Sequence, residues 1–110
     1  MSKKTEYLLV ITNCPGSITA KNIAQDLVTE KLAACVNIIP GVQSFFSWVG
    51  KVDKANEHML VIKTTLASYN VLEKRIKKLH PNELPEIIAV PIQAGSAEYL
   101  NWISKNTGKS

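Results

Sequence analysis

The 110-residue sequence contains few cysteines, glycines and aromatic residues, and it has no long hydrophobic run. No signal-like apolar segment is present, so we expect a reducing cytosol in which Cys14 and Cys35 remain free thiols. The five glycines are scattered, which excludes a glycine-rich phosphate-binding loop. No apolar stretch reaches the roughly 20 residues that a membrane helix needs. The sequence therefore predicts a cytoplasmic protein of one domain, residues 1–110, without a membrane partner.

The charge balance is mildly basic, with 13 lysines and arginines against 9 acidic residues and a formal net charge of +4. The densest internal group of cations is Lys74, Arg75, Lys77 and Lys78. Such a group can attract nucleic acid, but it more often forms the solvated face of a helix. Because no aromatic residue is interleaved with these cations to stack on bases, we expect no nucleic-acid partner.

Four β-prone runs predict the strands of one sheet. The second run is long and is expected to bend at Pro40, where the missing amide hydrogen interrupts the ladder. The chain is expected to turn at Gly50-Lys51, and Pro91 argues for an edge position of the last strand. The predicted strands cover residues 5–12, 34–49, 51–66 and 86–93.

Apolar residues at helical spacing predict amphipathic helices over 17–32 and 68–79 and a short last helix over 96–104. The order is then strand, helix, strand, strand, helix, strand and a short helix. This is the α+β, ferredoxin-like pattern (βαββαβ), in which two strand–helix–strand units interlock. The two longer helices are expected to cover one face of the sheet.

The predicted hairpin over 42–58 is longer than a compact four-stranded sheet requires. It carries Phe45, Phe46 and Trp48 close together. A lone hairpin with so much apolar surface is marginal in water and invites association. Pairing with other subunits in a closed symmetric assembly would cover it, and the alternative is that the aromatic side chains pack on their own sheet.

Five separated segments carry recognisable motifs along nearly the whole chain, namely Glu30–Ile38, Ser47–Lys51, Lys63–Thr65, His80–Ile87 and Tyr99–Ile103. In this order they resemble the CutA divalent-cation tolerance family. The resemblance implies a ferredoxin-like fold and a tight homotrimer in which strands of adjacent subunits pair, similar to nitrogen-regulatory signalling trimers. It also implies a link to tolerance of divalent metals, copper especially, and no known reaction. One departure is Asn82, which stands where the family usually has tyrosine.

The expected ligand is copper or another divalent cation, because a thiol and an imidazole suit copper better than magnesium or calcium. His80 matches a ligand position of the family. Cys14 is the second candidate, although Thr12 stands where some members have a copper-binding cysteine. No Cys-x-x-Cys or His-x-x-x-His pair is present, so one segment alone does not provide a closed zinc site. Cys35 is expected in the core and His58 on the surface.

A second candidate site is a ligand pocket at the boundary between subunits, a common place for small ligands. The alternative is that its residues only seal the interface. We expect a homotrimeric metal-binding or signalling-type protein that is not an enzyme. The open alternatives are a small-metabolite enzyme in which His80 and Glu83 act as acid and base, and a purely structural interaction module. The pocket residues are Trp48, Glu57, Lys63, Glu83 and Trp102.

Overall fold

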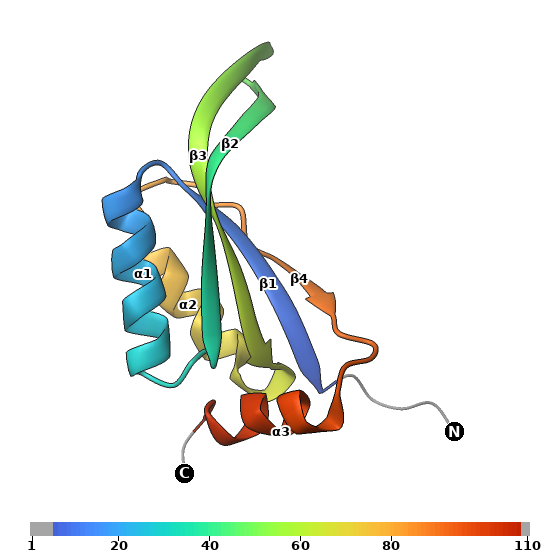
Figure 1. Cartoon of the computed structure of the whole chain (residues 1–110). Helices are drawn as coiled ribbons and strands as arrows, with labels where there is room; N and C mark the ends of the chain where they lie inside the picture. The colour runs from blue at the N-terminus through green and yellow to red at the C-terminus, as the bar shows by residue number, and fades with distance from the viewer. Residues whose placement is uncertain (1–5, 109–110) are drawn as a thin grey trace.

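The computed structural model describes residues 6–108, which form a four-stranded antiparallel sheet with three α-helices (Figure 1). The strand order is β2-β3-β1-β4. The predicted α+β class and order of elements are confirmed, while Thr5 of the first predicted strand lies outside the described residues. The strands are β1 (Tyr7–Cys14), β2 (Cys35–Trp48), β3 (Lys51–Thr65) and β4 (Ile88–Pro91). The helices are α1 (Ser17–Thr29), α2 (Tyr69–Leu79) and α3 (Ala97–Lys105), and a 3-10 turn, η1 (Leu66–Ser68), precedes α2.

Helices α1 and α2 lie on one face of the sheet, and α3 lies across its lower end (Figure 1). Side chains alternate between the two faces of a strand, so every second residue of β1 and β3 points toward α1 and α2. None of the described helices is long and apolar enough to cross a membrane. The buried apolar residues between sheet and helices include Leu8, Val10, Leu60 and Ile62 of the sheet, Ala20, Ile23 and Leu27 of α1, and Leu72 and Ile76 of α2.

Helix α1 ends three residues earlier than predicted, at Thr29. The amide of Lys31 donates to the Val28 carbonyl and the amide of Leu32 donates to the Leu27 carbonyl, which is the bonding pattern of a Schellman cap. Lys31 adopts φ = 58° at the position where glycine is usual. No glycine marks this end in the sequence, and the apolar Leu32 therefore extended the predicted helix.

The predicted bend at Pro40 is a β-bulge between β2 and β3. Ile39 pairs with Met59 and Val42 pairs with Glu57, so Pro40 and Gly41 oppose a single residue. Gly41 has φ = 74°, which a side chain would disfavour. Beyond the bulge the two strands leave the sheet and continue as a hairpin that projects from the body (Figure 1). We call this hairpin, residues 42–57, the arm.

The tip of the arm is a two-residue turn at Val49-Gly50, so the predicted turn at Gly50-Lys51 is wrong by one residue. Both turn residues have positive φ, as the tightest hairpin turns require. A β-branched residue is rare in this conformation. Strand β4 is shorter than predicted, but Pro91 does lie on an edge strand, which agrees with its lack of an amide hydrogen.

The apolar side chains of the arm do not fold back onto the core. Phe45 is 67% exposed, Trp48 is 50% exposed and Val52 is 79% exposed. The alternative that the aromatic residues pack fully on their own sheet is therefore wrong for the single chain.

The face of the sheet away from α1 and α2 is also apolar. Leu9, Ile11 and Val61 point to this face and are only partly buried, because α3 reaches only one end of the sheet. Ile88 and Val90 of β4 are about half exposed there, at 51% and 46%. We call this surface the open face. A solvated face of an antiparallel sheet would normally carry polar side chains.

One ion pair joins α1 to α2. Arg75 donates from Nε and Nη2 to the two carboxylate oxygens of Asp26, at 2.7 Å each. Hydrogen bonding to Arg75 holds the pKa of Asp26 below its usual range, because the bonds favour the charged carboxylate. A carboxyl group with a lowered pKa in the folded state stabilises the fold above its unfolded pKa, and this stabilisation is lost as the pH falls.

We predict that Asp26→Asn modestly lowers the free energy of unfolding at pH 7, measured by urea denaturation. The difference from the parent should shrink as the pH falls below about 4, where the unfolded carboxyl takes up a proton, and should vanish below the lowered pKa of folded Asp26, where the carboxyl is neutral in both states. Glu83→Gln, which removes an exposed carboxylate, is the matched control. A difference that stays constant down to pH 2 would show that the ion pair is not its cause.

Candidate functional site

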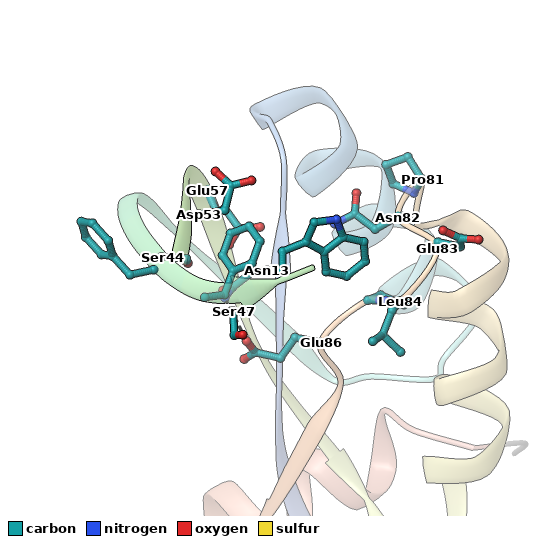
Figure 2. Close-up of a pocket in the computed structure, with 14 residues that line it drawn as sticks. Asn13, Ser44, Ser47, Asp53, Glu57, Pro81, Asn82, Glu83, Leu84 and Glu86 are labelled. Carbon is teal, nitrogen blue, oxygen red and sulfur yellow. Dashed lines mark hydrogen bonds between the residues drawn. The ribbon is translucent and has the colours of Figure 1, made fainter. Parts of the chain in front are cut away.

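A cleft of about 920 Å³ lies between the arm and the segment 81–86, which leads from α2 toward β4. Figure 2 shows Asp53 and Glu57 on the arm and Asn82, Glu83 and Leu84 on the opposite segment. The lining residues of the cleft are Asn13, Ser44, Phe45, Phe46, Ser47, Trp48, Asp53, Glu57, Pro81, Asn82, Glu83, Leu84, Pro85 and Glu86.

Strand register explains why acidic and aromatic side chains meet in this cleft. Phe46 pairs directly with Asp53, and directly paired residues project from the same face. Trp48 lies two residues beyond Phe46, and Glu57 lies four residues beyond Asp53, so all four share that face. The arm therefore presents two carboxylates and two aromatic rings to the cleft.

His80, at the end of α2, holds the other wall in place. Its ring is buried, with 6% of the residue exposed, and its Nε2 lies 2.7 Å from the backbone oxygen of Asn13. The backbone N–H of Asn82 donates to His80 Nδ1 at 3.1 Å. Since Nδ1 accepts a hydrogen bond, Nε2 must carry the proton and donate to Asn13. The imidazole thus links β1 to the cleft segment.

Asn13 of β1 links the sheet to Glu86 of the cleft. Its Nδ2 donates to Glu86 Oε1 at 3.3 Å, and its residue is 8% exposed. The Oδ1 atom is buried and has no hydrogen-bond partner among residues 6–108. An unpaired buried carbonyl oxygen is uncommon in folded proteins.

Cys14 is fully buried on the helix-covered face. Burial raises the pKa of its thiol to about 11, and the nearby negative charge of Glu57 adds to this shift. Cys14 of β1 pairs with His58 of β3. His58 is partly buried, and its Nδ1 has no partner among the described residues. The prediction that His58 lies on the surface is therefore wrong. The described part of the chain contains no group of three or more His, Cys, Asp or Glu residues that could hold a metal ion.

The five predicted pocket residues separate into two places within one chain. Trp48, Glu57 and Glu83 line the cleft, whereas Lys63 and Trp102 do not. Whether a second subunit brings the two groups together stays a prediction.

Lys63 projects from the open face, where its Nζ donates to Asn37 Oδ1 and lies 3.9 Å from Cys35 Sγ. Cys35 is thus a partly buried residue of the open face and not the core residue that we predicted. Trp102 stacks on Tyr99 with ring centroids 5.5 Å apart, and burial raises the pKa of Tyr99.

Asn13, Phe46 and Asp53 are among the cleft residues that sequence reasoning missed. A local signal existed for Asp53, because it lies four residues before Glu57 in a predicted strand and must share its face. The contact of Asn13 with Glu86 joins residues 73 positions apart, so the sequence carried no local signal for it.

Residues 8–106 match a family model described as CutA1 divalent ion tolerance protein. The chain belongs to the CutA1 family. A divalent-cation tolerance protein CutA of Thermus thermophilus is 46% identical over 100 residues, covering 91% of this chain and 97% of the relative. A chloroplastic CutA of Arabidopsis thaliana is 40% identical over 106 residues, and this match spans 96% of the chain but 58% of that longer protein.

Solved structures of CutA1 proteins have the same fold. The Thermus thermophilus structure has a TM-score of 0.92 at 45% identity and covers 93% of this chain and 99% of its own. A structure from Archaeoglobus fulgidus, named as a periplasmic divalent cation tolerance protein, has a TM-score of 0.88 at 36% identity and covers 91% of this chain and 97% of its own. The resemblance stated from the sequence motifs is confirmed. The CutA1 family is named for ion tolerance and not for a reaction.

We predict that His80→Ala lowers the free energy of unfolding by about 1–3 kcal/mol, because it leaves the buried Asn13 oxygen and Asn82 amide without partners. Urea denaturation followed by circular dichroism measures the change. Asn82→Ala is the matched control, since it keeps the backbone N–H that bonds to His80. Equal denaturation midpoints for His80→Ala and the parent would contradict the anchoring role of the imidazole.

Proposed function

We propose that the chain is a ferredoxin-like homotrimer of divalent-cation tolerance that binds a divalent metal, copper foremost, or acts as a signalling-type binding protein, without catalysing a reaction. We further propose that it acts in the cytoplasm, although relatives are named for chloroplast and periplasm. The observation that carries the trimer is the open face, an apolar sheet surface that the helices of the same chain leave uncovered.

The open face and the arm support assembly for the same physical reason. Transfer of apolar surface out of water is favourable by roughly 25 cal/mol per Å², so exposed apolar faces favour association. Ile39, Ile88 and Val90 on the open face and Phe45 and Trp48 on the arm are each at least 45% exposed. In a closed ring of copies, each subunit contacts one neighbour on either side through two different surfaces. The open face and the arm provide two such surfaces on one subunit.

His80 and Cys14 are the proposed metal ligands, and the structure defines what binding would involve. Copper would have to take the place of the Asn82 N–H at His80 Nδ1. It would also have to replace the proton of the Cys14 thiol, because the thiolate is the metal-binding form. Metal binding is therefore expected to displace the segment after α2.

The engagement of His80 supports a role without catalysis. An acid–base residue needs a ring nitrogen within reach of substrate, and both nitrogens of His80 bond to the protein backbone. Glu83, the other member of the alternative catalytic pair, is exposed at the rim of the cleft.

We predict a sedimentation mass of three times the 12.1 kDa of one chain at micromolar concentration. Trp48→Ala should raise the dissociation constant of the trimer by at least roughly tenfold, because truncation of an aromatic anchor that the proposed trimer would bury removes a major part of interface stability. Ile18→Ala is the matched control, since Ile18 is 76% exposed on α1, a helix on the other face of the sheet. A monomeric parent chain would refute the proposal.

We predict that copper titration, followed by calorimetry, gives stoichiometric binding that Cys14→Ser and His80→Gln each abolish. Cys35→Ser, which removes the thiol of the open face, should leave binding unchanged. Circular dichroism of each variant checks that it is folded. Unchanged copper binding by both folded variants would exclude these ligands, and it would leave the trimer as a separate question.

A further inference from the structure

We propose that Cys14 and His58 form a two-ligand site for a copper(I) ion, with the Cys14 Sγ and the His58 Nδ1 as ligands. This inference rests on the proposed metal binding and deepens it, because it keeps Cys14 as a ligand and assigns His58, in place of His80, as its partner for the monovalent ion. Both side chains project from the helix-covered face of the sheet. The proposed assembly uses the arm and the open face, so it leaves this site unchanged.

Strand register brings the two side chains together. Cys14 of β1 and His58 of β3 are directly paired, and directly paired residues project from the same face of a sheet, with Cβ atoms roughly 4.5–5.5 Å apart. Zn²⁺, which is isoelectronic with copper(I), binds sulfur at roughly 2.3 Å and nitrogen at roughly 2.0 Å. An ion bound to both side chains would thus span at most roughly 4.3 Å between them. The pair is close enough to share one ion.

Two polar atoms on this face lack hydrogen-bond partners. The Nδ1 atom of His58 is buried and has no partner among residues 6–108. Thr12, which is fully buried two residues before Cys14 on the same face of β1, has an Oγ1 that is also unpaired within the described chain. Buried polar atoms without partners are uncommon and indicate an occupant such as water or an ion. In contrast, both ring nitrogens of His80 already bond to the backbone.

The β-bulge fixes the position of His58. Pro40 and Gly41 form the bulge, and His58 is the single residue of β3 that they oppose. Bulges are frequent next to functional sites, where they change the direction of a side chain. His58 is partly exposed beside the base of the arm, so its ring offers an ion a route from solvent to the fully buried thiol of Cys14.

The ligand types and their number favour copper(I) over the common divalent ions. Thiolate and imidazole suit copper and zinc, whereas magnesium and calcium require oxygen ligands. Zinc sites have at least three protein ligands. No third histidine, cysteine or acidic residue of the described chain joins this pair closely enough to hold a metal ion. Copper(I) is stable with two ligands, so the pair is complete for this ion.

Burial favours the same ion. Copper(I) binds by replacing the proton of the Cys14 thiol, which passes to solvent, and the copper keeps its charge of +1. The thiolate, the ion and a neutral imidazole then carry no net charge. A divalent ion would leave a positive charge in the interior, which is costly.

The test is an anaerobic titration with copper(I) in competition with the chromophoric chelator bathocuproine disulfonate. The parent chain should bind a single copper(I) ion per subunit. Cys14→Ser and His58→Leu should each raise the dissociation constant by at least roughly tenfold, because each removes a ligand. Cys35→Ser, which removes the thiol of the open face, is the matched control and should leave the constant unchanged. Circular dichroism checks that each variant is folded.

X-ray absorption at the copper edge identifies the ligands in the parent chain without any variant. It should show a sulfur and a nitrogen neighbour and no others. Two sulfur neighbours, no copper(I) binding by the parent, an unchanged constant in folded His58→Leu, or displacement of copper(I) by excess zinc would each overturn the inference. Copper(I) binding that is lost in His80→Gln and kept in His58→Leu would also overturn it. Copper(II) titration and sedimentation of the parent report separately on the proposed function.

Discussion

Helices α1 and α2 cover one face of the four-stranded sheet, and the opposite face is apolar too. Every other property of the molecule depends on this imbalance. A chain of 110 residues can bury only one core, and α3 reaches only one end of the second face. Leu9, Ile11 and Val61 are therefore only partly buried within one chain. The apolar side chains of the arm are exposed as well, and transfer of such surface out of water would be favourable.

The bulge at Pro40-Gly41 connects this sheet to the cleft. It ends the regular ladder and allows β2 and β3 to continue beyond the body as the arm. The arm then forms one wall of the cleft, and the segment that His80 fixes to β1 forms the other. A turn-forming dipeptide and a buried imidazole, far apart in sequence, thus create one hollow.

The proposed metal ligands and the carboxylates of the cleft differ in their exposure to solvent. The thiol of Cys14 and the ring of His80 are buried and engaged within the fold, and burial raises the pKa of the thiol. The carboxylates of Asp53, Glu83 and Glu86 lie on the exposed lining of the cleft. A ligand of the buried pair must displace internal contacts, whereas a ligand of the cleft meets a site that is already open.

The sequence by itself determined the class of fold, the order of elements, the bend at Pro40 and the family, because these depend on local periodicity, on proline and glycine, and on contiguous motifs. Tertiary structure alone decided the rest. The contacts of Asn13 with Glu86 and His80 join distant segments, and the burial of His58 depends on strand register. The cap of helix α1 at Lys31 and the turn of the arm at Val49 have positive φ angles. Lysine and valine rarely adopt such angles, so the sequence does not predict them. Local preferences fix the elements, but only packing fixes which side chains meet.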